Sequence, residues 1–191
     1  MEKDNFICSW RIGPILTSSV RKLFHNPQRI LPPYLTDGMT AMDIGCGMGF
    51  FTIPMSGIVG KNGAVIGVDL QSEMLEGLGK NAEKAGVKNI ILHQCAQDSL
   101  LVEQWSGANG ANGTVDFALV FWMLHEVPDP ERLIRELRAV MSPKGKLLFV
   151  EPTVHVNKTA FQNSVKMITE SGFTVVDTPK IRISRSILFQ V

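Results

Sequence analysis

Short apolar runs and longer amphipathic segments alternate along most of the chain. A run of about four to eight apolar residues, bounded by glycine, proline or polar residues, is typical of a buried strand. Such runs predict strands over Met39–Ile44, Ala64–Val68, Asn89–His93, Val115–Phe121, Lys146–Val150, Phe173–Val176 and Ser186–Val191. Apolar residues spaced three and four apart indicate helices. This spacing predicts helices over Phe50–Val59, Ser72–Ala85, Pro130–Met141 and Lys158–Ser171.

Two further stretches have a weaker pattern. Gly13–Leu31 is expected to form a helix that ends at a Pro-Pro pair, because proline cannot continue a helix. Residues 1–35, which include this helix and His25, are expected to form an N-terminal helical segment that can fold over a site as a lid. Ser99–Gly113 is expected to be an irregular loop because of its glycines.

The order of these elements predicts an α/β fold. Alternation of strand and helix is typical of a doubly wound parallel sheet with helices on both faces. The last two predicted strands have no helix between them, so we expect them to pair antiparallel. No repeat or linker divides the sequence, and residues 1–191 are expected to form a single domain.

Composition excludes several classes of protein. Apolar residues make up 45% and charged residues 19% of the 191 residues, as in folded globular proteins. No apolar run approaches the roughly 20 residues that span a bilayer, and no secretory segment follows the polar start, so we expect a cytoplasmic protein without a membrane span. A net charge of +1 makes nucleic-acid binding unlikely as a default. Three cysteines without CxxC spacing predict neither disulfides nor a metal site. The oligomeric state is not indicated.

The strongest local pattern is Asp43–Gly49, where the first predicted strand turns into a helix. Gly45, Gly47 and Gly49 allow a tight turn and the close approach of a ligand. Asp69 ends the second strand, 20 residues after Gly49, where a carboxylate can accept hydrogen bonds from both hydroxyls of a ribose. These features together predict a site for a ribose-containing cofactor, although Asp69 could instead only cap the next helix.

Two cofactor classes fit this pattern: nicotinamide dinucleotides and S-adenosylmethionine. A dinucleotide loop usually reads G-x-G-x-x-G and holds a pyrophosphate, whereas this loop reads G-x-G-x-G and follows Asp43. A carboxylate repels a pyrophosphate but attracts a ligand with an amino group and a sulfonium. We therefore favour S-adenosylmethionine as the cofactor, with an NAD-dependent oxidoreductase as the alternative.

At this point the sequence from Ile30 to Val191 resembles the class I S-adenosylmethionine-dependent methyltransferases. Asp43–Gly49 resembles their first motif, Val68–Leu70 their second, and Phe121–Asp129 the segment after their fourth strand. Arg135–Leu148 matches their pattern of helix, proline-glycine turn and fifth strand. The resemblance is to small, single-domain members of the quinone-biosynthesis type, with methyltransferase domains of types 11 and 25. It implies a Rossmann-like sheet of seven strands in the order 3-2-1-4-5-7-6, with strand 7 antiparallel.

The resemblance also implies roles for single residues. The loop glycines would lie against the methionine part of the cofactor, Asp43 would orient its amino group, and Asp69 would hold the ribose. In the third family motif Cys95 takes the usual acidic place, so Gln97 or Asp98 is expected to contact the adenine instead. The residues expected at the cofactor are Asp43, Gly45, Cys46, Gly47, Gly49, Asp69, Leu70, Met74, Ala96, Gln97 and Phe121.

The candidate catalytic residues, His125 and Glu126, follow the fourth strand. With a reference pKa near neutrality, His125 can act as a general base if the acceptor must lose a proton. Alternatively it only shapes the pocket, which we favour because a lone histidine need not titrate in function. Trp122 is expected either to line the pocket or to belong to the core, and Glu151 faces the cleft without an assigned role.

The expected acceptor is a small molecule. Enzymes of this class that methylate exocyclic amines of nucleic acids usually carry Asn/Asp-Pro-Pro-Tyr/Phe after the fourth strand, where this chain has Phe-Trp-Met-Leu. No insertion large enough for a recognition domain is present. Methylation of rRNA, tRNA or protein is the lesser option, and a cofactor-binding protein without catalysis is the alternative from another class.

Overall fold

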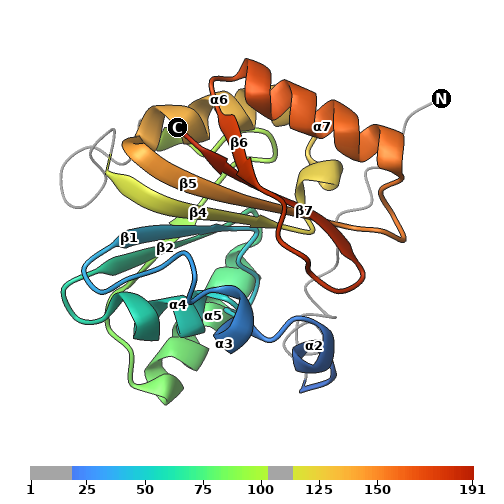
Figure 1. The fold of residues 1–191 in the computed structure, drawn as a ribbon. Helices are drawn as coiled ribbons and strands as arrows, with labels where there is room; N and C mark the ends of the chain where they lie inside the picture. Colours follow the sequence, from blue (N-terminus) through green and yellow to red (C-terminus); the bar gives the residue numbers. More distant parts are fainter. Residues whose placement is uncertain (1–18, 103–113) are drawn as a thin grey trace.

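The computed structural model describes residues 19–102 and 114–191, and it shows a mixed sheet between two layers of helices (Figure 1). The strands are β1 Thr40–Ile44, β2 Ala64–Asp69, β3 Ile90–Gln94, β4 Val115–Phe121, β5 Met141–Pro152, β6 Thr174–Asp177 and β7 Ser184–Gln190. Their order is β3-β2-β1-β4-β5-β7-β6. Strands β1 to β5 pair in parallel, whereas β7 pairs antiparallel with β5 and β6. The predicted fold and strand order are confirmed.

Helices cover both faces of the sheet. On one face lie α4 Thr52–Val59 and α5 Ser72–Ala85, and on the other lie α6 Pro130–Val140 and α7 Lys158–Glu170 (Figure 1). The predicted signals set their ends. The Asp129 side chain accepts a hydrogen bond from the Arg132 N–H at the start of α6. Gly86, with a left-handed φ of +69°, ends α5.

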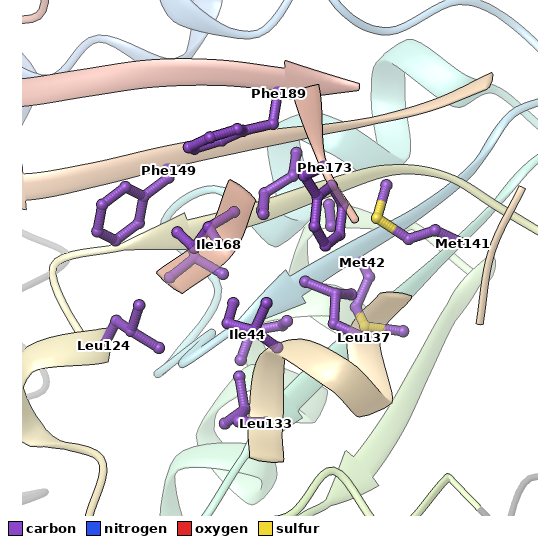
Figure 2. Close-up of a cluster of buried hydrophobic side chains, with 14 of the residues drawn as sticks. Met42, Ile44, Leu124, Leu133, Leu137, Met141, Phe149, Ile168, Phe173 and Phe189 are labelled. Atoms are coloured by element: carbon purple, nitrogen blue, oxygen red, sulfur yellow. The ribbon is translucent and has the colours of Figure 1, made fainter. Parts of the chain in front are cut away.

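Strand β1 contributes to two hydrophobic clusters, because successive side chains of a strand point to opposite faces. Met42 and Ile44 pack on the side of α6 and α7, in the cluster that includes Leu133 and Leu137 of α6 (Figure 2). Ala41 belongs to the cluster on the α4 side. The same alternation places the Asp43 side chain on the α4 side, close to the end of the strand.

The predicted single helix over Gly13–Leu31 is wrong in its described part. The chain there forms two short helices, α2 Ser19–Phe24 and α3 Pro27–Ile30. Pro27 has no N–H with which to continue α2, but proline suits the first turn of a new helix. The side chain of Asn26 caps that new helix by accepting a hydrogen bond from the backbone N–H two residues later.

Strand β5 starts earlier than its predicted first residue, Lys146. The segment Pro143-Lys-Gly, for which the sequence predicts a turn, lies within the strand, and the register against β4 shifts across it. The segment therefore forms a bulge in β5. At the other end of the strand, Val150 lies opposite Phe121, the last residue of β4. Glu151 consequently projects beyond the end of β4.

Some predictions concern residues outside the described ranges. They include the start of the predicted N-terminal helix, part of the 1–35 segment, Cys8, and the Ser99–Gly113 loop after Val102. Within residues 19–102 and 114–191, no helix has the length and apolar character needed to cross a bilayer.

Candidate functional site

The glycine loop joins β1 to α4 at the carboxyl edge of the sheet. The N–H groups of Gly45 and Cys46 donate hydrogen bonds to the Val68 carbonyl, over 2.8 and 3.0 Å, and hold the loop against the end of β2. Gly45, Gly47 and Gly49 have φ values of +75°, +52° and +95°. Because this left-handed region favours glycine, the path of the backbone depends on all three.

The three glycines differ in their surroundings. A Cβ at Gly45 would lie 3.0 Å from Met123 Cγ, and one at Gly49 would lie 2.5 Å from Leu78 Cδ1. At Gly47, no heavy atom of the described structure lies within 4 Å of the position that a Cβ would take. Gly45 and Gly49 are therefore also needed for close packing, whereas Gly47 faces open space that a ligand can approach.

The Asp69 carboxylate ties the end of β2 to this loop. Its Oδ2 accepts a hydrogen bond from the Gly47 N–H at 2.8 Å, and its Oδ1 accepts one from the Gln71 N–H at 3.0 Å. Burial raises the pKa of Asp69, and its backbone hydrogen bonds oppose the rise. Each carboxylate oxygen offers about two acceptor positions. Asp69 can therefore accept further hydrogen bonds from a ligand beside Gly47.

Asp43 is a second buried carboxyl beside the loop. Thr52 Oγ1, at the start of α4, donates a hydrogen bond to Asp43 Oδ2 at 2.6 Å. Burial raises the pKa of Asp43 to about 6, although the Thr52 hydrogen bond and the positive charge of Arg21 both act to lower it. At pH 7 the group is therefore mostly ionised, and the loop has a negative charge beneath it.

The segment after β3 packs beside Asp69. The Cys95 N–H donates a hydrogen bond to the Asp69 carbonyl at 3.0 Å, and the Gln94 side chain donates one to the Leu70 carbonyl at 3.1 Å. Met74 is buried in the first turn of α5. The second and third motifs are thus neighbours in space, at the end of β2.

The residues that follow Cys95 have different environments. The Ala96 N–H donates a hydrogen bond to the Ser99 carbonyl at 2.9 Å, and the Gln97 side chain is exposed. The Asp98 carboxylate lies 3.7 Å from the Arg132 guanidinium of α6, as an ion pair. Asp98 is thus turned toward α6, whereas Gln97 is open to solvent.

His125 and Glu151 form a close pair beyond the end of β4: His125 follows β4 in a short 3-10 helix, Leu124–Glu126, and Glu151 lies near the end of β5. His125 Nδ1 lies 2.7 Å from Glu151 Oε2, and the His125 N–H donates to Glu151 Oε1 at 3.1 Å. The Glu151 side chain is 1% exposed and that of His125 is 25% exposed. The hydrogen bond to Glu151 raises the pKa of His125, helped by the charges of Glu151 and Glu126 and opposed by burial. The pair leaves Nε2 as the nitrogen that can act on a substrate.

Phe121 and Trp122, at the end of β4, pack against His25, which lies between α2 and α3. The His25 ring contacts both of them edge to face, with ring centroids 5.0 and 4.6 Å apart. Trp122 has a φ of +61°, which is unusual for a bulky residue, and its Nε1–H donates to Ser184 Oγ at 3.0 Å. Strained backbone of this kind is concentrated at functional sites.

Sequence reasoning missed three features of the site: Thr52 as the partner of Asp43, Arg21 over the aromatic rings that follow the glycine loop, and the pairing of His125 with Glu151. The pairing had a signal, because His125 and Glu151 both follow predicted strands that are neighbours in the expected sheet order. Arg21 had none, since it lies in a segment without a clear hydrophobic period. In the described part of the chain, no group of three or more His, Cys, Asp or Glu side chains is placed to hold a metal ion.

Comparison with known proteins identifies the family. Residues 35–182 match the Methyltransf_31 model, described as a methyltransferase domain. The demethylmenaquinone methyltransferase of Lactococcus lactis is 30% identical over 128 residues, which are 65% of this chain and 48% of that protein. The Bacillus cereus protein of the same name is 29% identical over 115 residues, 60% of this chain and 45% of that protein. The chain thus spans about half the length of these curated relatives.

Solved structures show the same fold. A SAM-dependent methyltransferase from Aquifex aeolicus has a TM-score of 0.82 at 21% identity, covering 96% of this chain and 98% of that one. An S-adenosylmethionine-dependent methyltransferase from Mesorhizobium loti has a TM-score of 0.64 at 17% identity, covering 87% and 96%. At such identities the likeness concerns the fold alone. Because the methyltransferase model covers most of the sequence, the chain belongs to the family of S-adenosylmethionine-dependent methyltransferases.

Proposed function

We propose that this protein transfers the methyl group of S-adenosylmethionine to a small molecule with a hydroxylated ring. The observation that carries the proposal is the His125–Glu151 pair, which supplies a base at the carboxyl edge of the sheet. The names of the demethylmenaquinone methyltransferases support an acceptor with a quinone-type ring. Methylation of rRNA, tRNA or protein is the lesser alternative.

The residues around the glycine loop fit this donor. The open space at Gly47 admits the methionine part, Asp69 can accept hydrogen bonds from the ribose hydroxyls, and the charge of Asp43 attracts the α-amino group, directly or through water. The other residues proposed to line the donor site are Gly45, Cys46, Gly49, Leu70, Met74, Ala96, Gln97 and Phe121. When bound, the donor supplies an electrophilic methyl group on a sulfonium.

His125 is proposed to take a proton from the acceptor hydroxyl. A neutral ring with its proton on Nδ1 donates to Glu151, which leaves the lone pair on Nε2. Glu151 fixes the orientation of the ring and stabilises the imidazolium that forms when Nε2 accepts the proton. The Glu126 carboxylate, 3.9 Å from Nε2, adds to that stabilisation.

A hydroxylated ring needs such a base because a neutral phenol is a weak nucleophile. Transfer of the hydroxyl proton to Nε2 leaves the electron pair on the ring oxygen and, by resonance, on ring carbons. Either atom would then bond to the methyl carbon as the methyl–sulfur bond breaks, and S-adenosylhomocysteine would leave with that electron pair on sulfur. The partly exposed His125 ring can then release the proton to solvent. An uncharged amine would need no base before attack, so the pair favours an O–H acceptor.

Labelled S-adenosylmethionine tests the proposal against a panel of a naphthoquinol, a catechol, an aliphatic amine and a thiol. We expect labelled product from the hydroxylated rings. We also expect His125→Asn to lower kcat by about 10²- to 10⁴-fold while the Kd for the donor changes little.

Labelling of the amine or thiol alone, or an undiminished kcat in the variant, would contradict this assignment. Intact donor binding without labelled product, even in a cell extract, would favour a cofactor-binding protein without catalysis.

A further inference from the structure

Arg21, in α2, places a guanidinium group among four aromatic rings. Its Cζ lies 4.5 Å from the centre of the Phe50 ring, 5.6 Å from that of Phe51, 5.7 Å from that of Phe121 and 6.0 Å from that of Trp122. The first two residues directly follow the glycine loop, and Phe121 ends β4. Arg21 therefore lies at the carboxyl edge of the sheet, over the start of α4, although it is far from the loop in sequence.

The chain around Arg21 is held in place by other contacts. The His25 N–H donates a hydrogen bond to the Arg21 carbonyl at 2.8 Å. The His25 ring packs on Phe121 and Trp122, and its Nε2 lies 3.0 Å from the Arg182 carbonyl. These contacts hold the chain that carries Arg21 against the sheet.

Arg21 and Asp43 place opposite charges near the start of α4, Arg21 over the rings of Phe50 and Phe51 and Asp43 at Thr52. The guanidinium lies close enough to Asp43 to lower the pKa of that carboxyl, against the larger effect of burial. The methionine part of the proposed donor also carries opposite charges, an ammonium and a carboxylate on one carbon. Asp43 suits the ammonium, and the carboxylate requires a cation beside it.

We propose that the Arg21 guanidinium binds the α-carboxylate of the donor, so that α2 lies at one end of the donor site. A guanidinium can stack its flat face on an aromatic ring while its edge donates two parallel hydrogen bonds to a carboxylate. The ring of Phe50, 4.5 Å away, provides such a stacking surface. This inference rests on the proposed donor and is independent of the acceptor.

Titration calorimetry with S-adenosylmethionine and with decarboxylated S-adenosylmethionine tests the role of Arg21. The two ligands share the adenosine, the sulfonium and the amino group, and differ only in the carboxylate. We expect Arg21→Gln to weaken binding of S-adenosylmethionine by about 10- to 100-fold, the range for a hydrogen-bonded charge. The Kd of the decarboxylated ligand should change by less than about 3-fold, because this ligand lacks the group that Arg21 is proposed to bind.

Arg29→Gln is the matched control, because it removes an exposed arginine from α3 in the same segment. Arg21→Lys keeps the charge without the planar group and should lose less affinity than Arg21→Gln. Equal losses for both ligands would show a structural role and overturn the proposal, as would unchanged affinity for S-adenosylmethionine. If the unmodified protein bound neither ligand, the donor assignment itself would be wrong. Failure to methylate hydroxylated rings would leave these binding results unaffected.

Discussion

At the scale of the residue, the hydrogen bond between His125 and Glu151 sets the pH at which the proposed base works. It raises the pKa of His125 above the usual 6.5. Only the neutral ring can take a proton, so kcat/KM is expected to rise with pH through this raised pKa and then level off. A profile without a group titrating above 6.5 would contradict this role for the pair.

Glu151→Gln keeps a hydrogen-bond acceptor and removes the charge. We expect the pKa in the pH–rate profile to fall toward or below 6.5. We expect kcat to decrease by roughly 10- to 100-fold, which is less than the 10²- to 10⁴-fold that a general base contributes, because the His125 base itself remains. KM should change little, because Glu151 acts through His125. Glu131→Gln, on the exposed side of α6, is the control and should leave the profile in place.

At the scale of the element, two glycines of the same loop have different roles: Gly49 is required for packing, whereas Gly47 is proposed to leave room for the donor. Gly47→Ala introduces a left-handed alanine at a cost of about 1–2 kcal/mol, but its methyl group meets no described atom. We expect a modest decrease in Tm. We also expect donor affinity to fall by at least about 10-fold, because the added methyl group would occupy volume that the donor needs; a tenfold change in Kd corresponds to about 1.4 kcal/mol of binding free energy.

Gly49→Ala should lower Tm further, because its Cβ also meets Leu78. Gly57→Ala is the control, since Gly57 lies on the exposed side of α4 with nothing described within 4 Å, and alanine favours a helix. Thermal unfolding and calorimetry on the three variants would separate the effects. Unchanged donor affinity in Gly47→Ala would place the donor elsewhere.

Most elements could be predicted because each has a local cause. The strand Val115–Phe121 and the helix Ser72–Ala85 have the bounds that their hydrophobic patterns predict. The errors arose where one residue permits two structures. Pro27 can kink a helix or begin a new one, and a Pro-Lys-Gly segment can form a turn or a bulge. Contacts with neighbouring elements determine which of the two structures forms, and the local sequence pattern carries no information about those contacts.

The site was predictable to the extent that its residues lie at strand ends. Asp43 and Asp69 follow from the motifs, and the structure brings the Asp69 carboxylate to the loop. The His125–Glu151 contact joins residues 26 positions apart, one in the turn after β4 and the other in β5, so it requires the direction of each side chain as well as the strand order. The position of Arg21 depends on how its segment packs on the rest of the protein. That segment has no clear hydrophobic period, so the spacing of its residues does not predict the packing.

At the scale of the whole molecule, the buried Asp43 couples stability to binding. Its pKa rises from 3.8 to about 6 on folding, so between these pH values the folded state binds more protons than the unfolded state. Stability therefore decreases as pH rises through this window. At pH 7 the ionised carboxyl destabilises the fold by about 1–3 kcal/mol, since one pKa unit corresponds to about 1.4 kcal/mol.

Asp43→Asn should consequently raise Tm at pH 7 and have little effect on Tm near pH 4, where both side chains are neutral. Asparagine can still accept the Thr52 hydrogen bond. Donor affinity should fall in the variant, and in the unmodified protein it should weaken below about pH 6. Thermal unfolding at the two pH values and calorimetry check these outcomes. A lower Tm for the variant than for the unmodified protein at pH 7 would contradict this prediction, because it would mean that the charge of Asp43 stabilises the fold.

The position of β7 between β5 and β6 has a consequence for how the protein is made. A ribosome synthesises β6 before β7, yet β6 is joined to the sheet through β7. Until β7 emerges, β6 has no adjacent strand, and its Val175 and Val176, which remain 43% and 47% exposed after folding, are fully open to other chains. Completion of the sheet therefore waits for the synthesis of β7, and a nascent chain paused before β7 exposes an unpaired strand that is prone to pair with other chains.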